Sequence, residues 1–176
     1  MTDRVAIRQL PTRVPGLDQI LGGGLPEFSF NVIAGAPGAG KTTLAQQIMF
    51  ALATPKRPAL YFTVVGEPPI KMLRYQQLFG FFDKDRVGAD VHFLNLTEEA
   101  LDGDIDGVLM RIILEVDRLH PGLVVVDSFR SLARAVSIDG PTTRVEHFLP
   151  AHHLGADEAT LDVAVDAPRG FDRLRT

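Results

Sequence analysis

Short apolar runs alternate along this chain with segments whose apolar residues recur at helical spacing. Four runs predict strands, at 30–34, 59–65, 91–95 and 123–126. The intervening segments predict helices at 41–52, 70–79 and 108–119, a further helix over 129–136, and a short helix at 17–21 that stops at three glycines. The last strand, Leu-Val-Val-Val, is apolar at every position, which is typical of a strand buried on both faces. The alternation therefore predicts an α/β fold whose mostly parallel sheet is covered by helices on both faces.

Composition narrows the class of protein. The chain has 176 residues, 45% of them hydrophobic and 23% charged, which suits one domain with a real core and excludes a disordered chain. A net charge of −4 argues against sequence-independent binding of nucleic acid, which depends on clustered basic residues. The sequence has no cysteine, no apolar leader at its start and no apolar run long enough to span a bilayer, so we expect a cytoplasmic protein without membrane contact.

A glycine-rich loop lies between the first predicted strand and the helix after it. Its sequence, Gly-Ala-Pro-Gly-Ala-Gly-Lys-Thr, fits the phosphate-loop pattern G-x-x-x-x-G-K-[ST]. Backbone N–H groups of such a loop point at phosphate oxygens, and the helix dipole favours the same anion. Lys41 is expected to reach the β- and γ-phosphates and the Thr42 hydroxyl to bind Mg²⁺. The predicted nucleotide-binding residues are Gly35, Ala36, Pro37, Gly38, Ala39, Gly40, Lys41, Thr42 and Thr43.

An aspartate follows the apolar run at 123–126. Open parallel sheets bind ligands at the carboxyl ends of their strands, so Asp127 is placed to hold Mg²⁺ opposite the phosphate loop. Ser128 could hydrogen-bond the attacking water or the γ-phosphate. The alternative is that Asp127 only caps the next helix, and the phosphate loop upstream favours the magnesium role.

Several motifs together resemble the KaiC-like ATPase domain of the RecA-like P-loop ATPases. They are Gly-Leu-Asp at 16–18, Leu-Gly-Gly-Gly-Leu-Pro at 21–26, the phosphate loop, Tyr-Phe-Thr at 61–63 and Val-Val-Val-Asp-Ser at 124–128. The resemblance runs from about Val14 to Val136. It implies a RecA-like three-layer sandwich that binds ATP and Mg²⁺ and assembles into a homo-oligomer, commonly a hexameric ring with ATP between subunits. The circadian clock members of the family also phosphorylate themselves on Ser or Thr, an activity that the resemblance alone would imply.

The sequence departs from the clock members where they carry two adjacent glutamates that position the attacking water. Aligning on Thr63 places Val65 and Gly66 at that pair, with Glu67 one position further on. A carboxylate base must lie within about 3 Å of its water, directly or through one more water. Glu67 is therefore either a displaced catalytic residue or a solvated turn residue, and we expect slow hydrolysis.

The composition changes after residue 139. We divide the chain into an N-terminal lead at 1–13, an ATP-binding core at 14–139 and an atypical tail at 140–176, which lacks lysine. RecA-like sheets have a strand between the phosphate-loop strand and the aspartate strand, and Leu161–Val165 is the candidate for it, expected to run parallel to both. Because Asp162 interrupts its apolar pattern, we expect the C-terminal strands of the family to be missing or altered here.

Three functions follow from these motifs. The first is a Mg²⁺-dependent ATPase of the KaiC-like type. The second is an ATP-binding regulatory or assembly module that hydrolyses little ATP and acts through a protein partner, which Val65 and Gly66 favour. The third, a RecA-type DNA recombinase, is disfavoured by the acidic charge balance.

Overall fold

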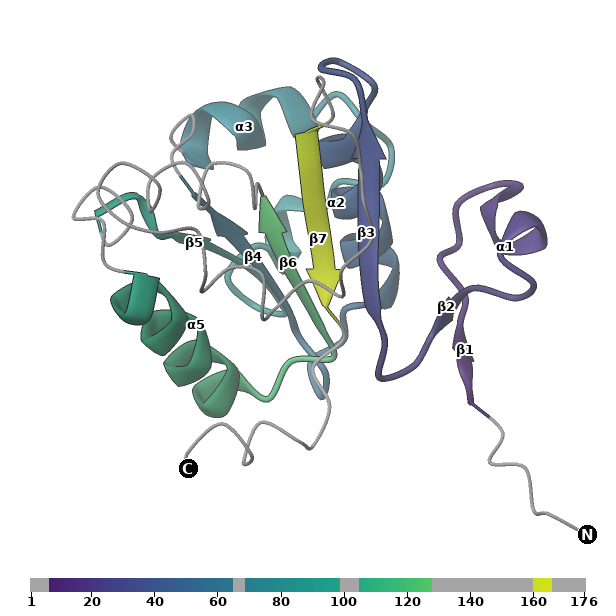
Figure 1. Cartoon of the computed structure of the whole chain (residues 1–176). Coiled ribbons are helices and arrows are strands. Elements are labelled where there is room, and N and C mark those ends of the chain that lie inside the picture. Colours follow the sequence, from purple (N-terminus) through teal and green to yellow (C-terminus); the bar gives the residue numbers. More distant parts are fainter. Residues whose placement is uncertain (1–6, 65–68, 99–104, 128–159, 166–176) are drawn as a thin grey trace, which may run out of the picture.

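A computed structural model describes residues 7–64, 69–98, 105–127 and 160–165. Its main sheet has five strands in the order β3-β7-β6-β4-β5 (Figure 1). Their bounds are Phe30–Gly35 for β3, Ala59–Thr63 for β4, Val91–Asn95 for β5, Leu123–Asp127 for β6 and Thr160–Val165 for β7. Strand β4 pairs in parallel with both β5 and β6. The α/β prediction with a RecA-like, mostly parallel sheet is confirmed.

Strand β7 occupies the place between β3 and β6 for which residues 161–165 were the candidate, but the direction expected for it, parallel to both neighbours, is wrong. It pairs antiparallel with both neighbours, so that Thr160 faces Gly35 and Val165 faces Phe30. The apolar pattern of a short strand carries no information about direction. Direction depends on the edge at which the chain re-enters the sheet, and β7 starts beside Gly35, the last residue of β3.

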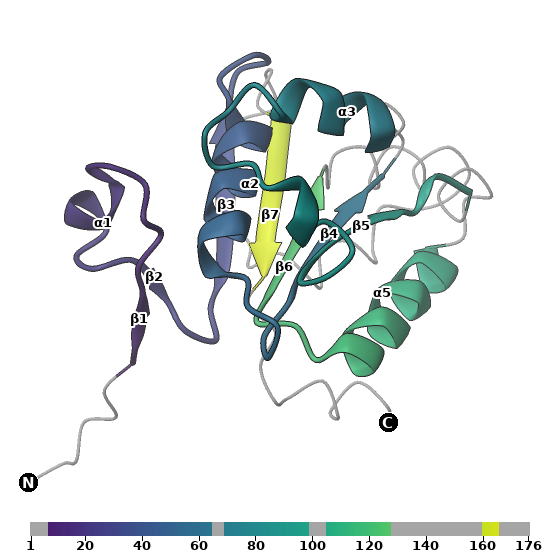
Figure 2. The same ribbon diagram turned by 180° about the vertical axis from the view of Figure 1, so that it is seen from behind.

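Helices pack on both faces of the sheet. Helix α2 (Lys41–Leu52) covers one face, where Ile48 and Met49 pack among residues that include Tyr61 and Val125. Helix α5 (Ile105–Leu119) covers the other, with Val108 against strand residues of β4 and β6. Figures 1 and 2 show these two helices on opposite sides, with α3 (Pro69–Gln76) across the carboxyl edge of the sheet. The three layers follow from the central strands β4 and β6, whose residues are buried on both faces of the sheet.

The predicted helices match closely where they fall on described residues. Helix α2 has its predicted bounds, while α3 and α5 begin earlier than the sequence pattern indicated, and α3 also ends earlier. The helix expected at 129–136 lies outside the described residues. Among the helices that the structure does describe, none combines the length and apolar character that a membrane crossing requires.

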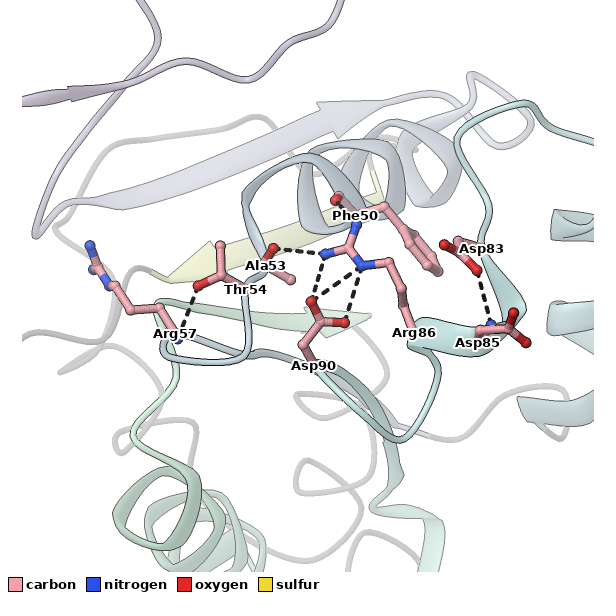
Figure 3. A network of polar contacts seen from close by, with 8 residues as sticks. All are labelled: Phe50, Ala53, Thr54, Arg57, Asp83, Asp85, Arg86 and Asp90. Carbon is pink, nitrogen blue, oxygen red and sulfur yellow. Dashed lines mark hydrogen bonds and ion pairs between the residues drawn. The ribbon is translucent and has the colours of Figure 1, made fainter.

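An arginine connects the carboxyl-terminal end of α2 to the segment that leads into β5. Arg86, in the short 3₁₀ helix η1 (Lys84–Arg86), donates through Nη1 to the carbonyl of Phe50 at 2.6 Å and through Nη2 to that of Ala53 at 2.7 Å. The same guanidinium binds both carboxylate oxygens of Asp90, with Nη2–Oδ2 at 2.9 Å (Figure 3). Asp90 is only 5% exposed. Arg86 therefore neutralises a buried carboxylate and supplies donors to helix carbonyls that have no partner within the helix.

Residues 9–26, which precede the phosphate loop, form an arm beside the sheet (Figure 1). Strand β1 (Gln9–Leu10) pairs antiparallel with β2 (Leu25–Pro26), and α1 (Leu17–Ile20) lies between them in sequence. Gly24 has a φ of 135°, and a Cβ there would lie 2.1 Å from the carbonyl oxygen of Leu10, so only glycine fits. The triple-glycine motif thus has a structural role, since it lets the two strands of the arm approach each other.

Asp18 closes the loop before α1. Its Oδ1 accepts hydrogen bonds from the backbone N–H of Thr12 at 2.8 Å and from the Thr12 hydroxyl at 2.6 Å, and its Oδ2 accepts from the N–H of Arg13 at 3.2 Å. Arg13 has a φ of 58°, a conformation that a non-glycine residue adopts rarely. The carboxylate thus holds together a tight and locally unfavourable turn.

These hydrogen bonds make the stability of the turn at Thr12 and Arg13 depend on pH. The Thr12 hydroxyl, followed by the backbone N–H groups of Thr12 and Arg13, lowers the pKa of Asp18 below its ordinary value of 3.8. Because the folded pKa is depressed, the stabilisation is present above that ordinary value and is lost as the pH falls through the folded pKa. We expect the Thr12 and Arg13 amide resonances to titrate in an NMR pH series with a midpoint below 3.8. Asp18→Asn should abolish this titration, and a midpoint at or above the ordinary value would contradict it.

Candidate nucleotide-binding site

The phosphate loop connects the end of β3 to the start of α2, as the sequence predicted. Gly38 and Gly40 have φ values of 78° and 82°, which place both in the left-handed region that favours glycine. Gly40 is the N-cap of α2 and provides no side-chain hydrogen bond to the helix. The first N–H groups of the helix are therefore left for a ligand, and the positive end of its dipole lies at the loop.

Lys41 lies within this loop rather than in solvent. The residue is 9% exposed, and its Nζ donates to the carbonyl oxygen of Ala36 at 3.0 Å. The aliphatic part of the side chain passes close to Gly35, where a Cβ would lie 3.9 Å from Cδ. The ammonium group thus already lies over the loop, where it would contact an anion bound there.

Asp127 meets the first turn of α2 across the carboxyl edge of the sheet. Its Oδ2 accepts a hydrogen bond from the Thr42 hydroxyl at 2.8 Å, although 85 positions separate the two residues. The phosphate loop and the aspartate strand are therefore brought together as the sequence predicted. Asp127 ends β6 beside Thr63, and the N–H of Val64 donates to its carbonyl at 2.9 Å.

Thr42 and Asp127 fit the donor set of a magnesium site. A hydroxyl oxygen and a carboxylate oxygen, in contact beside a phosphate loop, are hard ligands of the kind that Mg²⁺ takes together with phosphate oxygens and water. Thr43 is half-buried in the first turn of the same helix. Two further predicted site residues, Glu67 and Ser128, lie outside the described residues.

The sequence analysis missed one residue of this site. The hydroxyl of Tyr61 donates to the same Oδ2 of Asp127 that binds Thr42. A signal was present in the strand register, because Tyr61 faces Val125 across the parallel pair and Asp127 follows Val125 by two positions on the same face. A tyrosine at that position can extend its hydroxyl toward the strand end.

Comparison with known proteins identifies the family of the chain. The family model for the KaiC ATPase matches residues 10–146. DNA repair protein RadA of Mycobacterium tuberculosis (strain ATCC 25618 / H37Rv) is 30% identical over 179 residues, covering 95% of this chain and 34% of that protein. RadA of Mycolicibacterium smegmatis is 32% identical over 160 residues, covering 90% of this chain and 31% of that protein. A UPF0273 protein of Thermotoga maritima is 35% identical over 75 residues, covering 43% of this chain and 31% of that protein.

The chain thus spans about a third of the length of the curated relatives it matches. The family match covers the arm, the phosphate loop and the aspartate strand in one continuous stretch. On this evidence the chain belongs to the KaiC ATPase family, within the RecA-like P-loop ATPases that bind nucleotides.

Proposed function

We propose that the protein binds ATP together with Mg²⁺ and hydrolyses it slowly, as a KaiC-like ATPase. The observation that carries the proposal is the 2.8 Å hydrogen bond between Thr42 and Asp127, which joins the phosphate loop to the aspartate strand. Together the two residues supply the oxygen ligands of a metal–phosphate complex.

The donor groups of the site would bind the phosphates, and its oxygen atoms would bind the metal ion. Loop N–H groups and the Lys41 ammonium would hold the β- and γ-phosphates, exchanging the present contact with the Ala36 carbonyl for phosphate oxygens. Thr42 and Asp127 would hold the metal ion. When bound, the ion supplies positive charge that offsets the negative charge developing on the phosphates. These residues would bind and orient the nucleotide and the metal ion. A separate residue would be needed to position the water that attacks the γ-phosphate.

Slow turnover is proposed from the segment after β4. The family's clock members carry paired glutamates there, whereas this chain has Val65 and Gly66 followed by Glu67. An ATP-binding regulatory or assembly module with little turnover is the corresponding alternative, acting through a protein partner or as a homo-oligomer. Measuring ATP binding by calorimetry alongside steady-state phosphate release separates the two. Binding without release supports the module, and release that is lost in Glu67→Gln supports the enzyme.

The metal role of Asp127 is tested by Asp127→Asn. We expect MgATP affinity to fall about 10- to 100-fold, while affinity for ATP in the presence of a chelator changes little, because the lost charge matters only when the metal is bound. Titration calorimetry with and without Mg²⁺ measures both values. The control is Asp117→Asn, on the exposed side of α5. Equal losses with and without metal would show that Asp127 acts only as a structural hydrogen-bond acceptor.

A role in DNA repair is a second candidate, favoured by the alignment with RadA over 95% of this chain. The net charge of −4 weighs against broad contact with a phosphate backbone, so any DNA contact would be local. A gel-shift assay with single-stranded DNA, with and without MgATP, tests it. A nucleotide-dependent shift that weakens with salt would support this candidate, and no shift at low salt would exclude it.

A further inference from the structure

Tyr61 is a fully buried residue whose hydroxyl reaches the proposed metal site. It lies in the middle of β4 with no exposed surface, and its ring packs against that of Phe93 with centroids 5.4 Å apart. The hydroxyl donates to Oδ2 of Asp127. The ring thus belongs to the core beneath α2, and the hydroxyl belongs to the site above it.

The two hydrogen bonds to Asp127 come from different parts of the fold. Thr42 belongs to the first turn of α2 and Tyr61 to β4, and both donate to Oδ2. Within the described part of the chain, no hydrogen bond to Oδ1 of Asp127 is found. Two donors from separate elements restrain the rotation of the carboxylate, and the lone pairs of Oδ1 remain able to accept another ligand.

We propose that Tyr61 is a positioning residue, whose hydroxyl orients the Asp127 carboxylate for the binding of MgATP. This inference rests on the proposed binding of MgATP. Carboxylates that bind metal ions are commonly held by hydrogen bonds from residues behind them, and loss of such a residue lowers metal affinity by about 10- to 100-fold. If the Thr42 hydroxyl were to hold a metal ion in place of its present hydrogen bond, the Tyr61 hydroxyl would still keep Asp127 in one orientation.

The alternative is that Asp127 only provides a hydrogen-bond acceptor for Tyr61, because a buried phenol needs one. The two views differ in what Tyr61→Phe does. If the hydrogen bond only satisfies the phenol, the variant loses stability and binds nucleotide as before. If the phenol positions the carboxylate, the variant loses affinity that depends on the metal.

The experiment compares Tyr61→Phe with Tyr75→Phe in the full chain. These are the two tyrosines of the sequence, and Tyr75 is 59% exposed on α3, which makes it a matched control. Calorimetry gives the affinity for ATP with Mg²⁺ and with a chelator, and thermal unfolding reports the integrity of the core. We expect Tyr61→Phe to weaken MgATP binding about tenfold or more, to leave metal-free ATP binding within about twofold, and to raise the Mg²⁺ concentration at half-maximal binding.

Other outcomes would contradict either the role of Tyr61 or the proposed function. Equal weakening with and without Mg²⁺, or a loss of thermal stability with unchanged affinities, would overturn the positioning role of Tyr61. If unaltered protein and Tyr75→Phe bind no ATP, or bind it equally with and without Mg²⁺, the proposed function itself fails. If Tyr61→Phe does not fold, NMR of the unaltered chain follows the ring resonances of Tyr61 and Tyr75 as Mg²⁺ is added to the ATP-bound protein. A shift at Tyr61 but not at Tyr75 supports the positioning role, and an unchanged Tyr61 resonance overturns it.

Discussion

Replacing Lys41 with alanine is expected to lower MgATP affinity by about 2–4 kcal/mol. The side chain is held over the loop by the Ala36 carbonyl at 3.0 Å and is 9% exposed, so its charge lies where the phosphates would bind. The substitution removes this charge but leaves the left-handed glycines and the start of α2 in place. Titration calorimetry with purified protein measures the loss.

Lys56→Ala is the control for this experiment. Lys56 lies exposed in the turn between α2 and β4, at the opposite end of the helix, so the variant carries the same charge change away from the loop. It should bind MgATP as the unaltered protein does. Unchanged affinity in Lys41→Ala would remove the phosphate-loop assignment, whereas equal losses in both variants would indicate a general effect of net charge.

Replacing Arg86 with alanine is expected to lower the free energy of unfolding by about 3 kcal/mol, at the low end of the range for breaking a buried ion pair. The variant would leave the Asp90 side chain, which is 7% exposed, without its counterion. It would also remove the donors to the carbonyls of Phe50 and Ala53. Because the Arg86 side chain is itself 29% exposed, water can replace part of what is lost.

Urea unfolding compares this variant with Arg118→Ala. Arg118 also binds a buried carboxylate, that of Glu115 at 2.6 Å, but it is 61% exposed, and Arg111 binds the other oxygen of Glu115 at 3.1 Å. The control should therefore lose about 1 kcal/mol or less. A loss of that small size in Arg86→Ala would show that the end of α2 does not depend on the guanidinium.

The sequence predicted best what is encoded locally. Helix α2 could be bounded because glycine precedes it, apolar residues recur through it, and Pro55 and Pro58 follow it. Asp127 could be placed because an apolar strand ending in a carboxylate has its end at the ligand edge of a parallel sheet. In both cases the pattern lies among neighbouring residues of the sequence, at most from Gly40 to Pro58, where periodicity is informative.

What the sequence could not predict depends on distant partners. The β1–β2 pair is only two residues long on each side, too short for any alternation to appear. The direction of β7 is set by where the chain re-enters the sheet, which no pattern within the strand records. The hydrogen bond from Tyr61 to Asp127 spans 66 positions and requires the register between two strands.

The position of β7 also dictates when the site can form during synthesis. In the described sheet β3 is hydrogen-bonded to β7, whose residues leave the ribosome more than 120 positions after their partners in β3. A nascent chain can therefore carry the whole phosphate loop and the aspartate strand while β3 still lacks its neighbour. Pairing over such sequence distances is slow, because the entropy of closing the loop opposes it until the contacts form. We therefore expect β3 and the phosphate loop that follows it to be fixed in the sheet only at this late step, when β7 is inserted.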